Sequence, residues 1–445
     1  MKKTIYFFLF YCFFILAGRG NAVSQTSQKK IKAVPANDFL NSLGVCSSIT
    51  GRGETLKGTI DALTYTGIRF VRCGLEDRIF VQDMITLHKQ TGARICYGLL
   101  SGGTDLDRLL RESRQLASAG VLLALEGNNE PNNWTVTYQG ETGGGNLSWM
   151  PVAKLQRDLY SLVKSDAVLK NYPVWNISEG GAQTDNVGLQ FLTIPERANT
   201  LMPAGTQYAD YANCHNYITH PAWPGLHDNQ TWLSASPGAD CPVDGLYKNY
   251  GLTWRNYFEG YSESELLTLP RVTTETGYSI DKDVNEEMQA RLYMNLYLSQ
   301  FKRGWSYTAI YLLRTRENEP DHESFALYTM DYTPKQAAHY LHNLTTILAD
   351  NKSIDRTGSL GYFIVNRPAT VHDLLLQKSD GKFFLVVWGE KFTGGKDEIS
   401  ITFSKIHRFV NIYDPTTGTL PISTKKQVKS VQLMMSDHPL VVEIY

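Results

Sequence analysis

Two glutamates, Glu130 and Glu275, are the side chains of this sequence best placed to do chemistry. Glu130 lies in the polar stretch 126–134 that follows the apolar run 121–125, and Glu275 ends the β-branched run 271–275. Glu130 stands between Asn129 and Pro131. A surface turn would explain the asparagine and the proline, but it does not need a glutamate between them. Two opposed carboxylates are what hydrolysis of a glycosidic bond requires, because one protonates the leaving oxygen while the other attacks the anomeric carbon or activates water. Taken singly, a glutamate of this kind is more often a helix cap or part of a surface ion pair. The catalytic interpretation therefore depends on whether the strands and helices bring the two glutamates together.

Those elements follow a repeating order of strand, loop and helix between Leu43 and Leu313. Alternating strands and helices predict parallel βα units, and eight of them fit a (β/α)8 barrel, which we assign to residues 43–350. The predicted strands are Leu43–Ser47, Ile68–Cys73, Arg94–Leu99, Val121–Leu125, Val174–Ile177, Tyr211–Tyr217, Val272–Glu275 and Tyr307–Leu313. The predicted helices are Val81–Thr91, Leu106–Ala119, Pro151–Ser165, Asn285–Arg303 and Gln336–Asp350. A doubly wound open sheet is the alternative, but residues 46–53 lack the glycines of a phosphate-binding loop.

The predicted barrel places the two glutamates at the same end of the molecule. Chemistry in such barrels is carried out at the C-terminal ends of the strands. Glu130 follows the fourth predicted strand and Glu275 ends the seventh, which lie across the barrel mouth from each other. Both carboxylates can therefore reach one cleft. A separation of roughly 5–5.5 Å would predict retention of anomeric configuration, and roughly 6.5–9.5 Å would predict inversion.

After Asp350 the sequence pattern changes to short alternating strands. Turn signals separate them, such as Asp380-Gly381, Gly394-Gly395 and Asp414-Pro415. We assign residues 351–445 to an all-β sandwich domain. Its predicted strands are Val371–Gln377, Phe383–Trp388, Glu398–Phe403, Phe409–Tyr413, Val428–Met434 and Leu440–Tyr445. Residues 23–42 are assigned to a linker, although 23–32 could instead add a strand to the sandwich.

The motifs around the two glutamates resemble those of clan A glycoside hydrolases. The triplet Asn129-Glu130-Pro131 at the end of strand four, with Glu275 at the end of strand seven, is similar to the family 39 and family 5 type of organisation. The resemblance covers the barrel in outline, and an appended β-sandwich is common in the clan. It implies a retaining enzyme that needs no cofactor or metal. Glu130 would be the general acid/base and Glu275 the nucleophile.

The resemblance also implies a set of substrate-binding residues. Asn129 would donate a hydrogen bond to the sugar 2-hydroxyl, and Arg72 matches the arginine that steadies the nucleophile. His215 and Tyr217 match the His-x-Tyr of the family 5 type and lie on one side of their strand. The clan commonly has a tryptophan at the end of strand eight, where this chain offers Tyr311 or Arg314 instead. Trp134 is the best candidate for a sugar-stacking platform, and Tyr278 is a further candidate contact.

The first 22 residues predict export. Lys2 and Lys3 precede the apolar run 4–17, which is followed by small residues up to Ala22, the layout of a secretory signal peptide. A membrane helix needs roughly 20 apolar residues, so a retained anchor is the weaker alternative. We therefore expect a secreted, periplasmic or cell-surface protein that has no membrane attachment after cleavage. Five cysteines follow this segment with no metal-site spacing, and Cys214 with Cys241 is the best candidate for a disulfide.

Composition narrows the class of partner. The net charge of −1, with 20% charged residues, gives no electrostatic reason to expect binding to nucleic acid or a membrane surface. The expected partner is an oligo- or polysaccharide, and the expected state is a monomer. Three alternatives are a non-catalytic sugar-binding barrel, a protein whose sandwich serves cell-surface attachment, and a polysaccharide lyase. The first would be expected to lose one carboxylate, the second to expose an aromatic strip on 355–445, and the third to use a tyrosine, histidine or lysine base.

Overall fold

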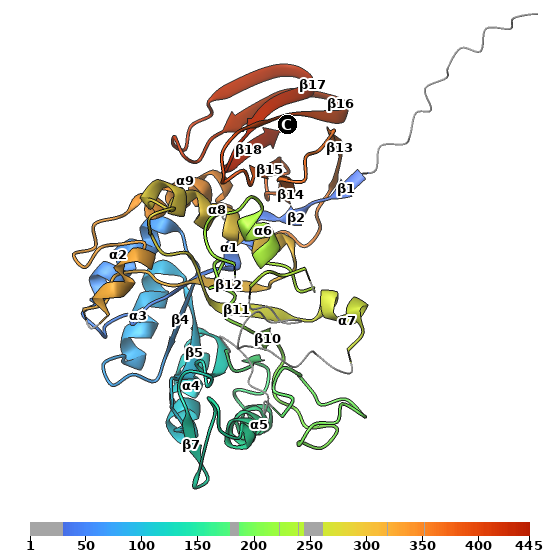
Figure 1. Cartoon of the computed structure of the whole chain (residues 1–445). Helices are drawn as coiled ribbons and strands as arrows, with labels where there is room; N and C mark the ends of the chain where they lie inside the picture. Colours follow the sequence, from blue (N-terminus) through green and yellow to red (C-terminus); the bar gives the residue numbers. More distant parts are fainter. Residues whose placement is uncertain are drawn as a thin grey trace, which may run out of the picture.

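The computed structural model describes residues 30–178, 187–221, 223–238, 240–243, 261–317, 319–350 and 352–445. A barrel of strands and helices lies below a separate layer of β-strands (Figure 1). The predicted signal peptide, 1–22, lies outside the described residues. Within the described ranges no helix has the length and apolar character that crossing a bilayer requires.

Eight parallel strands form the barrel in the order β10-β11-β12-β3-β4-β5-β6-β9. A further parallel bridge joins Trp175 to Tyr211, next to β10, so the sheet closes on itself. The predicted (β/α)8 barrel is confirmed, and each predicted barrel strand overlaps an observed one. The strands are β3 (Leu43–Cys46), β4 (Phe70–Gly74), β5 (Arg94–Leu100), β6 (Leu122–Asn128), β9 (Val174–Trp175), β10 (Ala212–Asn213), β11 (Arg271–Thr276) and β12 (Tyr307–Ile310).

Amphipathic helices surround the barrel strands (Figure 1). In α4 the buried side chains recur every three or four residues, from Leu106 and Leu109 to Leu116, which puts one apolar face against the strands. The helix predicted from Gln336 to Asp350 ends at Leu348. The longer helices are α2 (Leu56–Thr66), α3 (Val81–Thr91), α4 (Leu106–Ser118), α5 (Met150–Ser165), α8 (Glu286–Lys302) and α9 (Gln336–Leu348). The shorter ones are α1 (Ala36–Asn41), α6 (Gln230–Ser234), α7 (Glu263–Thr268) and η1 (Pro320–Phe325), and a small hairpin pairs β7 (Val136–Tyr138) with β8 (Glu141–Gly143).

The barrel interior changes from apolar to polar along the strands. The rings of Phe70 and Trp175 fill one level, with centroids 6.2 Å apart. Gly44 makes room for them, because a Cβ there would lie 2.0 Å from the Phe70 ring. Two residues beyond Phe70 on β4 comes Arg72, which is buried and contacts the buried Glu126 of β6. Side chains two residues apart on a strand share a face, so the apolar floor carries a layer of charged side chains directly above it.

The predicted β-sandwich is also confirmed, with a different strand pattern. The segments predicted as two strands, 398–403 and 409–413, form one long strand, whose register shifts between Thr402 and His407. Its first half pairs with β13, a strand that was not predicted, and its second half pairs with β18, so it belongs to both layers. The strands are β13 (Ser359–Val365), β14 (Val371–Gln377), β15 (Phe383–Gly389), β16 (Asp397–Tyr413), β17 (Ser423–Met435) and β18 (Pro439–Ile444).

The N-terminal segment joins both parts of the fold. Within the predicted linker 23–42, the described residues form β1 (Lys30–Lys32), β2 (Val34–Pro35) and α1. The first strand pairs with β13 and the second with β14, while Phe39 and Leu40 of α1 are buried in the barrel core. The pairing of β1 agrees with the alternative given for residues 23–32, an added strand of the sandwich, and the chain crosses the sandwich before it enters the barrel.

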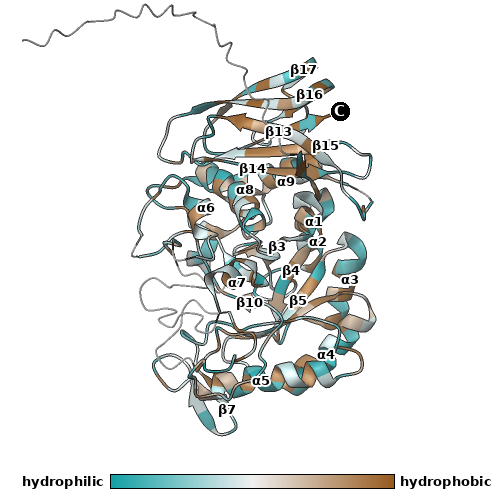
Figure 2. Ribbon diagram, turned by 90° about the vertical axis from the view of Figure 1, so that its right-hand side faces the viewer, coloured by the Kyte–Doolittle hydropathy of each residue, from teal (hydrophilic) through white to brown (hydrophobic). Residues whose placement is uncertain are grey.

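The sandwich is fixed to the barrel through α6, α8 and α9. Alternate residues of β14 face opposite sides: Leu374 and Leu376 pack in the barrel core, and Leu375 packs inside the sandwich. Hydrophobic residues accordingly concentrate on the strands next to α8 and α9 (Figure 2). Glu390 caps α6 by accepting hydrogen bonds from the backbone of Thr231 at 3.0 Å and of Trp232 at 3.1 Å. Burial raises the pKa of Glu390 to about 7.

The cysteines act as core residues. Cys46, Cys73 and Cys96 are buried on barrel strands. Cys214 and Cys241, the candidate disulfide pair, are buried as thiols, and Sγ of Cys241 donates to the carbonyl of Val243 at 3.3 Å. A small polarisable side chain therefore fills space at these positions.

Candidate active site

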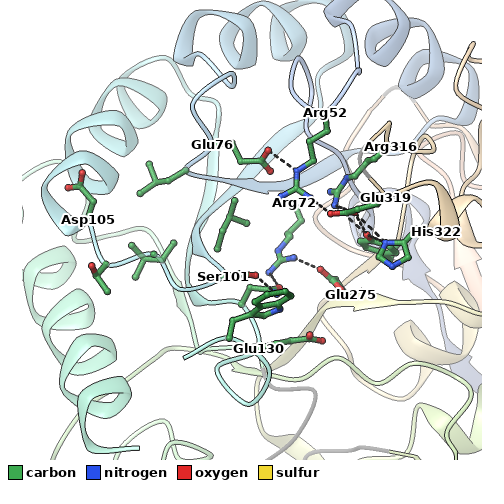
Figure 3. Close-up of a pocket in the computed structure, with 18 of the residues that line it drawn as sticks. Arg52, Arg72, Glu76, Ser101, Asp105, Glu130, Glu275, Arg316, Glu319 and His322 are labelled. Carbon is green, nitrogen blue, oxygen red and sulfur yellow. Dashed lines mark hydrogen bonds and ion pairs between the residues drawn. The ribbon is translucent and has the colours of Figure 1, made fainter. Parts of the chain in front are cut away.

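A cavity of about 760 Å³ opens at the C-terminal ends of the barrel strands, and both glutamates line it. Figure 3 shows Glu275 and Glu130 facing the same space, with Arg72 directed at Glu275. Loops after β3, β4, β5 and β12 supply most of the remaining wall. The lining includes Arg52, Arg72, Glu76, Ser101, Asp105, Arg108, Asn129, Glu130, Trp134, Tyr217, Glu275, Tyr311, Arg316, Glu319, His322 and Phe325.

The backbone turn at Glu130 explains the polar stretch that follows β6. Glu130 has a φ of 40°, in the left-handed region that non-glycine residues seldom occupy. Its N–H donates to the carbonyl of Ser178 at 2.7 Å, and its carbonyl accepts from the N–H of Asn133 and of Trp134 at 2.8 and 2.9 Å. Such a conformation costs on the order of 1–3 kcal/mol and persists where surrounding contacts enforce it. Here the contacts hold Glu130 at the barrel mouth.

Glu275 is held by a cation and a hydroxyl. Nη1 of Arg72 lies 2.7 Å from one carboxylate oxygen, and the hydroxyl of Tyr217 donates to the other at 3.0 Å. Burial disfavours the Arg72 charge, but Glu126 and Glu275 outweigh it and keep the pKa of Arg72 above its ordinary value. Burial and the nearby Glu275 raise the pKa of Tyr217, so its hydroxyl remains a donor. These contacts place a positive charge beside Glu275 and fix the orientation of its carboxylate.

Glu126 is a further candidate site residue, which the sequence analysis missed. It is fully buried and forms a two-point ion pair with Arg72, with contacts of 2.8 and 3.0 Å. Burial raises the pKa of Glu126, but Arg72 and the Thr274 hydroxyl lower it further than burial raises it, so Glu126 is ionised. The sequence did contain a sign of this role: a charged residue inside an otherwise apolar strand needs a partner of opposite charge.

The two candidate catalytic carboxylates lie close together. One oxygen of Glu130, one oxygen of Glu275 and a ring nitrogen of His215 all lie within 4.8 Å of one another. An upper limit of 4.8 Å between one oxygen of each carboxylate is compatible with the roughly 5–5.5 Å carboxyl separation of retaining glycosidases. The same three groups could ligate a metal ion, but the Arg72 cation already occupies one oxygen of Glu275 and would repel a second cation.

A hydrogen-bonded chain leads from Glu130 into the barrel. Nδ1 of His215 lies 2.8 Å from Glu130, and Nε2 lies 3.1 Å from the hydroxyl of Thr274. That hydroxyl donates its hydrogen to Glu126 at 2.7 Å and accepts from the amide of Asn213 at 3.0 Å. Toward His215 it can therefore only accept, so Nε2 of His215 carries a hydrogen. A hydrogen bond between Nδ1 and a carboxylate oxygen needs a second proton. Nδ1 and Glu130 therefore share one further proton. Burial raises the pKa of Glu130, but hydrogen bonds from His215 and Asn133 outweigh it and place the pKa below its usual value.

Removing the Thr274 hydroxyl is expected to disturb this shared proton. Thr274→Val deprives the Nε2–H of His215 of its acceptor, which destabilises the protonated His215–Glu130 pair. We expect the alkaline limb of the kcat/KM profile to move by about one unit to lower pH. Thr274→Ser, which keeps the hydroxyl, is the matched control and should leave the profile in place. An unchanged profile in Thr274→Val would show that the chain does not set the protonation of Glu130.

The structure brings most of the other predicted residues to the cavity. Asn129 accepts from Arg72 at 2.8 Å through its side-chain oxygen, and its amide donates to Ser101 at 3.2 Å. Trp134 lines the cavity with 55% of its surface exposed, as a stacking platform requires. Tyr311, at the end of β12, lines it as well, and its hydroxyl donates to Glu319 at 2.9 Å.

Three predicted substrate contacts do not line the cavity: His215 is buried behind Glu130, and the other two lie elsewhere. Tyr278 is buried, and its hydroxyl donates to the carbonyl of Gly225 at 3.2 Å. The guanidinium of Arg314 donates to the carbonyl of Met330 at 2.7 Å and lies over the ring of Tyr332. Neither side chain lines the cavity. Arg316, two residues further on, lines the cavity instead. The strand β12 ends at Ile310, so the path of the following loop, and not the alternation of a strand, decides which side chain points inward.

Comparison with known proteins finds similar structures but no similar sequence. No protein-family model matches the chain, and no curated protein matches its sequence. A family 39 glycoside hydrolase from the gut symbiont Bacteroides cellulosilyticus WH2 has a similar structure, with a TM-score of 0.56 at 14% identity over 92% of this chain and 82% of that one. The chain shares the fold of this glycoside hydrolase.

Two further structures agree over nearly the whole length of each protein. A GH51 arabinofuranosidase from Xanthomonas axonopodis pv. citri has a TM-score of 0.55 at 12% identity, over 93% of this chain and 98% of that one. A GH30 endoxylanase from Clostridium papyrosolvens C71 has a TM-score of 0.51 at 12% identity, over 94% and 97%. Both barrel and sandwich are therefore shared. Identities this low establish the architecture, and the chemistry must be argued from the site itself.

Proposed function

We propose that this protein is a retaining glycoside hydrolase, with Glu275 as nucleophile and Glu130 as general acid/base. The observation that carries the proposal is the pair of carboxylates whose nearest oxygens lie within 4.8 Å across the barrel mouth. Their environments differ as the two roles require, because one contacts a permanent cation and the other an imidazole that shares its proton.

In the first step Glu275 attacks the anomeric carbon and forms a covalent glycosyl-enzyme. The ion pair with Arg72 and the hydrogen bond from Tyr217 hold the carboxylate aligned before the attack. Arg72 itself is held by its two contacts with Glu126. The guanidinium therefore stays in position when the charge on Glu275 is consumed, because its other partner remains.

In the same step Glu130 delivers a proton to the leaving oxygen. The proton shared with Nδ1 of His215 supplies it, so Glu130 acts as an acid even though its own pKa lies below the usual value. In the second step Glu130 accepts a proton from the water that hydrolyses the glycosyl-enzyme, and His215 shares it again. One proton enters and one leaves in each cycle.

The rest of the proposal concerns substrate and location. A sugar ring would stack on Trp134, and its 2-hydroxyl would meet the amide of Asn129. We infer that the substrate is an oligo- or polysaccharide met outside the cytoplasm, that residues 1–22 direct export, and that the protein acts as a monomer without a cofactor. The signal-like sequence supports export, and the aromatic, carboxylate-rich cavity supports a carbohydrate substrate.

The test is the stereochemistry of hydrolysis. A panel of aryl glycosides, together with plant, microbial and host polysaccharides, identifies a hydrolysed substrate, and proton NMR then follows the anomeric signal of the first product formed. We expect the same anomeric configuration as in the substrate, before mutarotation. An inverted first product would contradict the roles given to Glu130 and Glu275, and a protein that binds sugars without hydrolysing any would contradict the proposal as a whole.

A further inference from the structure

The arginines that line the cavity are already paired with carboxylates of the protein. Among the described residues, Arg52 contacts Glu76 at 3.0 Å and also contacts Glu319. Arg72 contacts Glu126 and Glu275, and Arg108 contacts Glu112 at 2.8 Å. Arg316 contacts Glu319 at 3.0 Å. An incoming anion would therefore have to compete with a carboxylate for each guanidinium.

Glu319 is the centre of the largest of these clusters. Its two carboxylate oxygens bind different arginines, Arg52 on one and Arg316 on the other, and the second oxygen also accepts from the hydroxyl of Tyr311 at 2.9 Å. Figure 3 shows Glu319, Arg316 and His322 together on the side of the cavity next to Glu275. Burial raises the pKa of Glu319, but Arg316 and Tyr311 lower it to about 2, so it is ionised at every working pH.

The lining as a whole has no excess of positive charge. Its described ionisable groups include four guanidinium groups, those of Arg52, Arg72, Arg108 and Arg316, and five carboxyl groups, those of Glu76, Asp105, Glu130, Glu275 and Glu319. A sugar carboxylate placed among them would meet like charges at short range and find no free cation, and such a contact selects against the charged ligand. Sugar hydroxyls, in contrast, can donate to Glu76, Asp105 and Glu319.

We propose that the enzyme acts on uncharged glycosides and that Glu319 excludes uronic acids from the side of the cavity next to Glu275. This inference rests on the proposed function for its kinetic test but not for its binding test. Glu319 holds the guanidinium groups of Arg52 and Arg316 together and presents its own negative charge to the cavity. Neutralising this one side chain would leave two cations without their shared counter-ion and would create a site for a sugar carboxylate.

The kinetic experiment compares wild type with Glu319→Gln on matched substrates. The pairs are 4-nitrophenyl glucoside with glucuronide, and galactoside with galacturonide, which differ only in the oxidation of C6. We expect wild type to favour the uncharged member of a pair by at least about 100-fold in kcat/KM, and Glu319→Gln to lower that preference by at least about tenfold. Equal use of both members by wild type, or an unchanged preference in the variant, would overturn the inference.

Glu317→Gln is the matched control. Glu317 lies two residues away and carries the same charge, but it is 65% exposed, lies 4.0 Å from Arg314 and does not line the cavity. We expect Glu317→Gln to keep the wild-type preference. An equal loss of preference in Glu317→Gln would mean that the overall charge of the protein, and not Glu319, sets the selectivity, which also overturns the inference.

A binding measurement separates this inference from the proposed function. Saturation-transfer NMR with millimolar D-glucuronate and D-galacturonate needs no turnover. We expect Glu319→Gln to give a signal that weakens with added salt, and wild type to give a much smaller one. If wild type hydrolyses no glycoside but the variant gains uronate binding, the proposed function fails while the role of Glu319 stands. If wild type binds uronates as strongly as the variant, the role of Glu319 is wrong whatever the activity.

Discussion

Replacing Glu275 with alanine is expected to lower kcat/KM for an aryl glycoside by at least about three orders of magnitude, or about 4 kcal/mol of transition-state stabilisation. The variant has no nucleophile, so no glycosyl-enzyme forms. The fold should survive the change, because Arg72 keeps both of its contacts with Glu126. An unchanged thermal unfolding midpoint would confirm that activity is lost at the site rather than through unfolding.

Azide provides the decisive readout for this variant. The small anion fits the space that the Glu275 carboxylate leaves and attacks the anomeric carbon from the same face. We expect added azide to restore turnover and to give a glycosyl azide of inverted configuration. Wild type and Glu317→Ala, which changes an exposed carboxylate outside the cavity, should show no acceleration. Hydrolysis by Glu275→Ala at the wild-type rate would show that Glu275 is not the nucleophile.

Replacing Glu130 with alanine is expected to have an effect that depends on the leaving group. A general acid contributes about 10²–10⁴-fold when the leaving oxygen needs a proton, so kcat/KM should fall by that factor for a natural sugar leaving group. A dinitrophenolate leaves without help, so the first step should remain fast and the glycosyl-enzyme should accumulate. A burst of dinitrophenol followed by slow turnover, measured by stopped-flow absorbance, would support this role.

The stereochemistry with azide distinguishes the two glutamates. In Glu130→Ala the glycosyl-enzyme still forms on Glu275, and azide then displaces that carboxylate. Two inversions give a glycosyl azide of retained configuration, the opposite of the product expected from Glu275→Ala. If both variants gave the same azide configuration, the assignment of acid/base and nucleophile would be wrong. An equal loss of activity for all leaving groups would likewise contradict a general-acid role for Glu130.

The barrel could be predicted because its strands are buried on both faces. Every residue of β6 is buried, so the strand appears in the sequence as a continuous apolar run with polar residues only near its end. The sandwich was predicted less accurately at β16, where the sequence pattern of buried and exposed residues does not follow the pairing of the strand. The register shift in β16 interrupts the alternation of buried and exposed residues, so one strand that serves two layers has the sequence pattern of two.

The candidate site was predicted to the extent that it lies on strands. Glu130, Glu275, Arg72, His215 and Tyr217 all lie on or directly after predicted strands, and the structure gathers them within contact of one another. The residues that form the far wall lie on loops, where no periodicity indicates which way a side chain points. Arg316 and Glu319 could therefore not be distinguished from Arg314 and Glu317 before the path of the loop was known.

The sequence by itself determined the architecture and predicted the two candidate carboxylates, because apolar periodicity and strand order are local properties that place strand ends at one barrel mouth. Only the tertiary structure decided that the two carboxylates have different surroundings, which the proposed roles require. Arg72 lies between Glu126 and Glu275, and Thr274 lies between His215 and Glu126. These pairings join residues far apart along the chain, and charge and proton positions depend on distances of a few ångströms that only the closed barrel fixes.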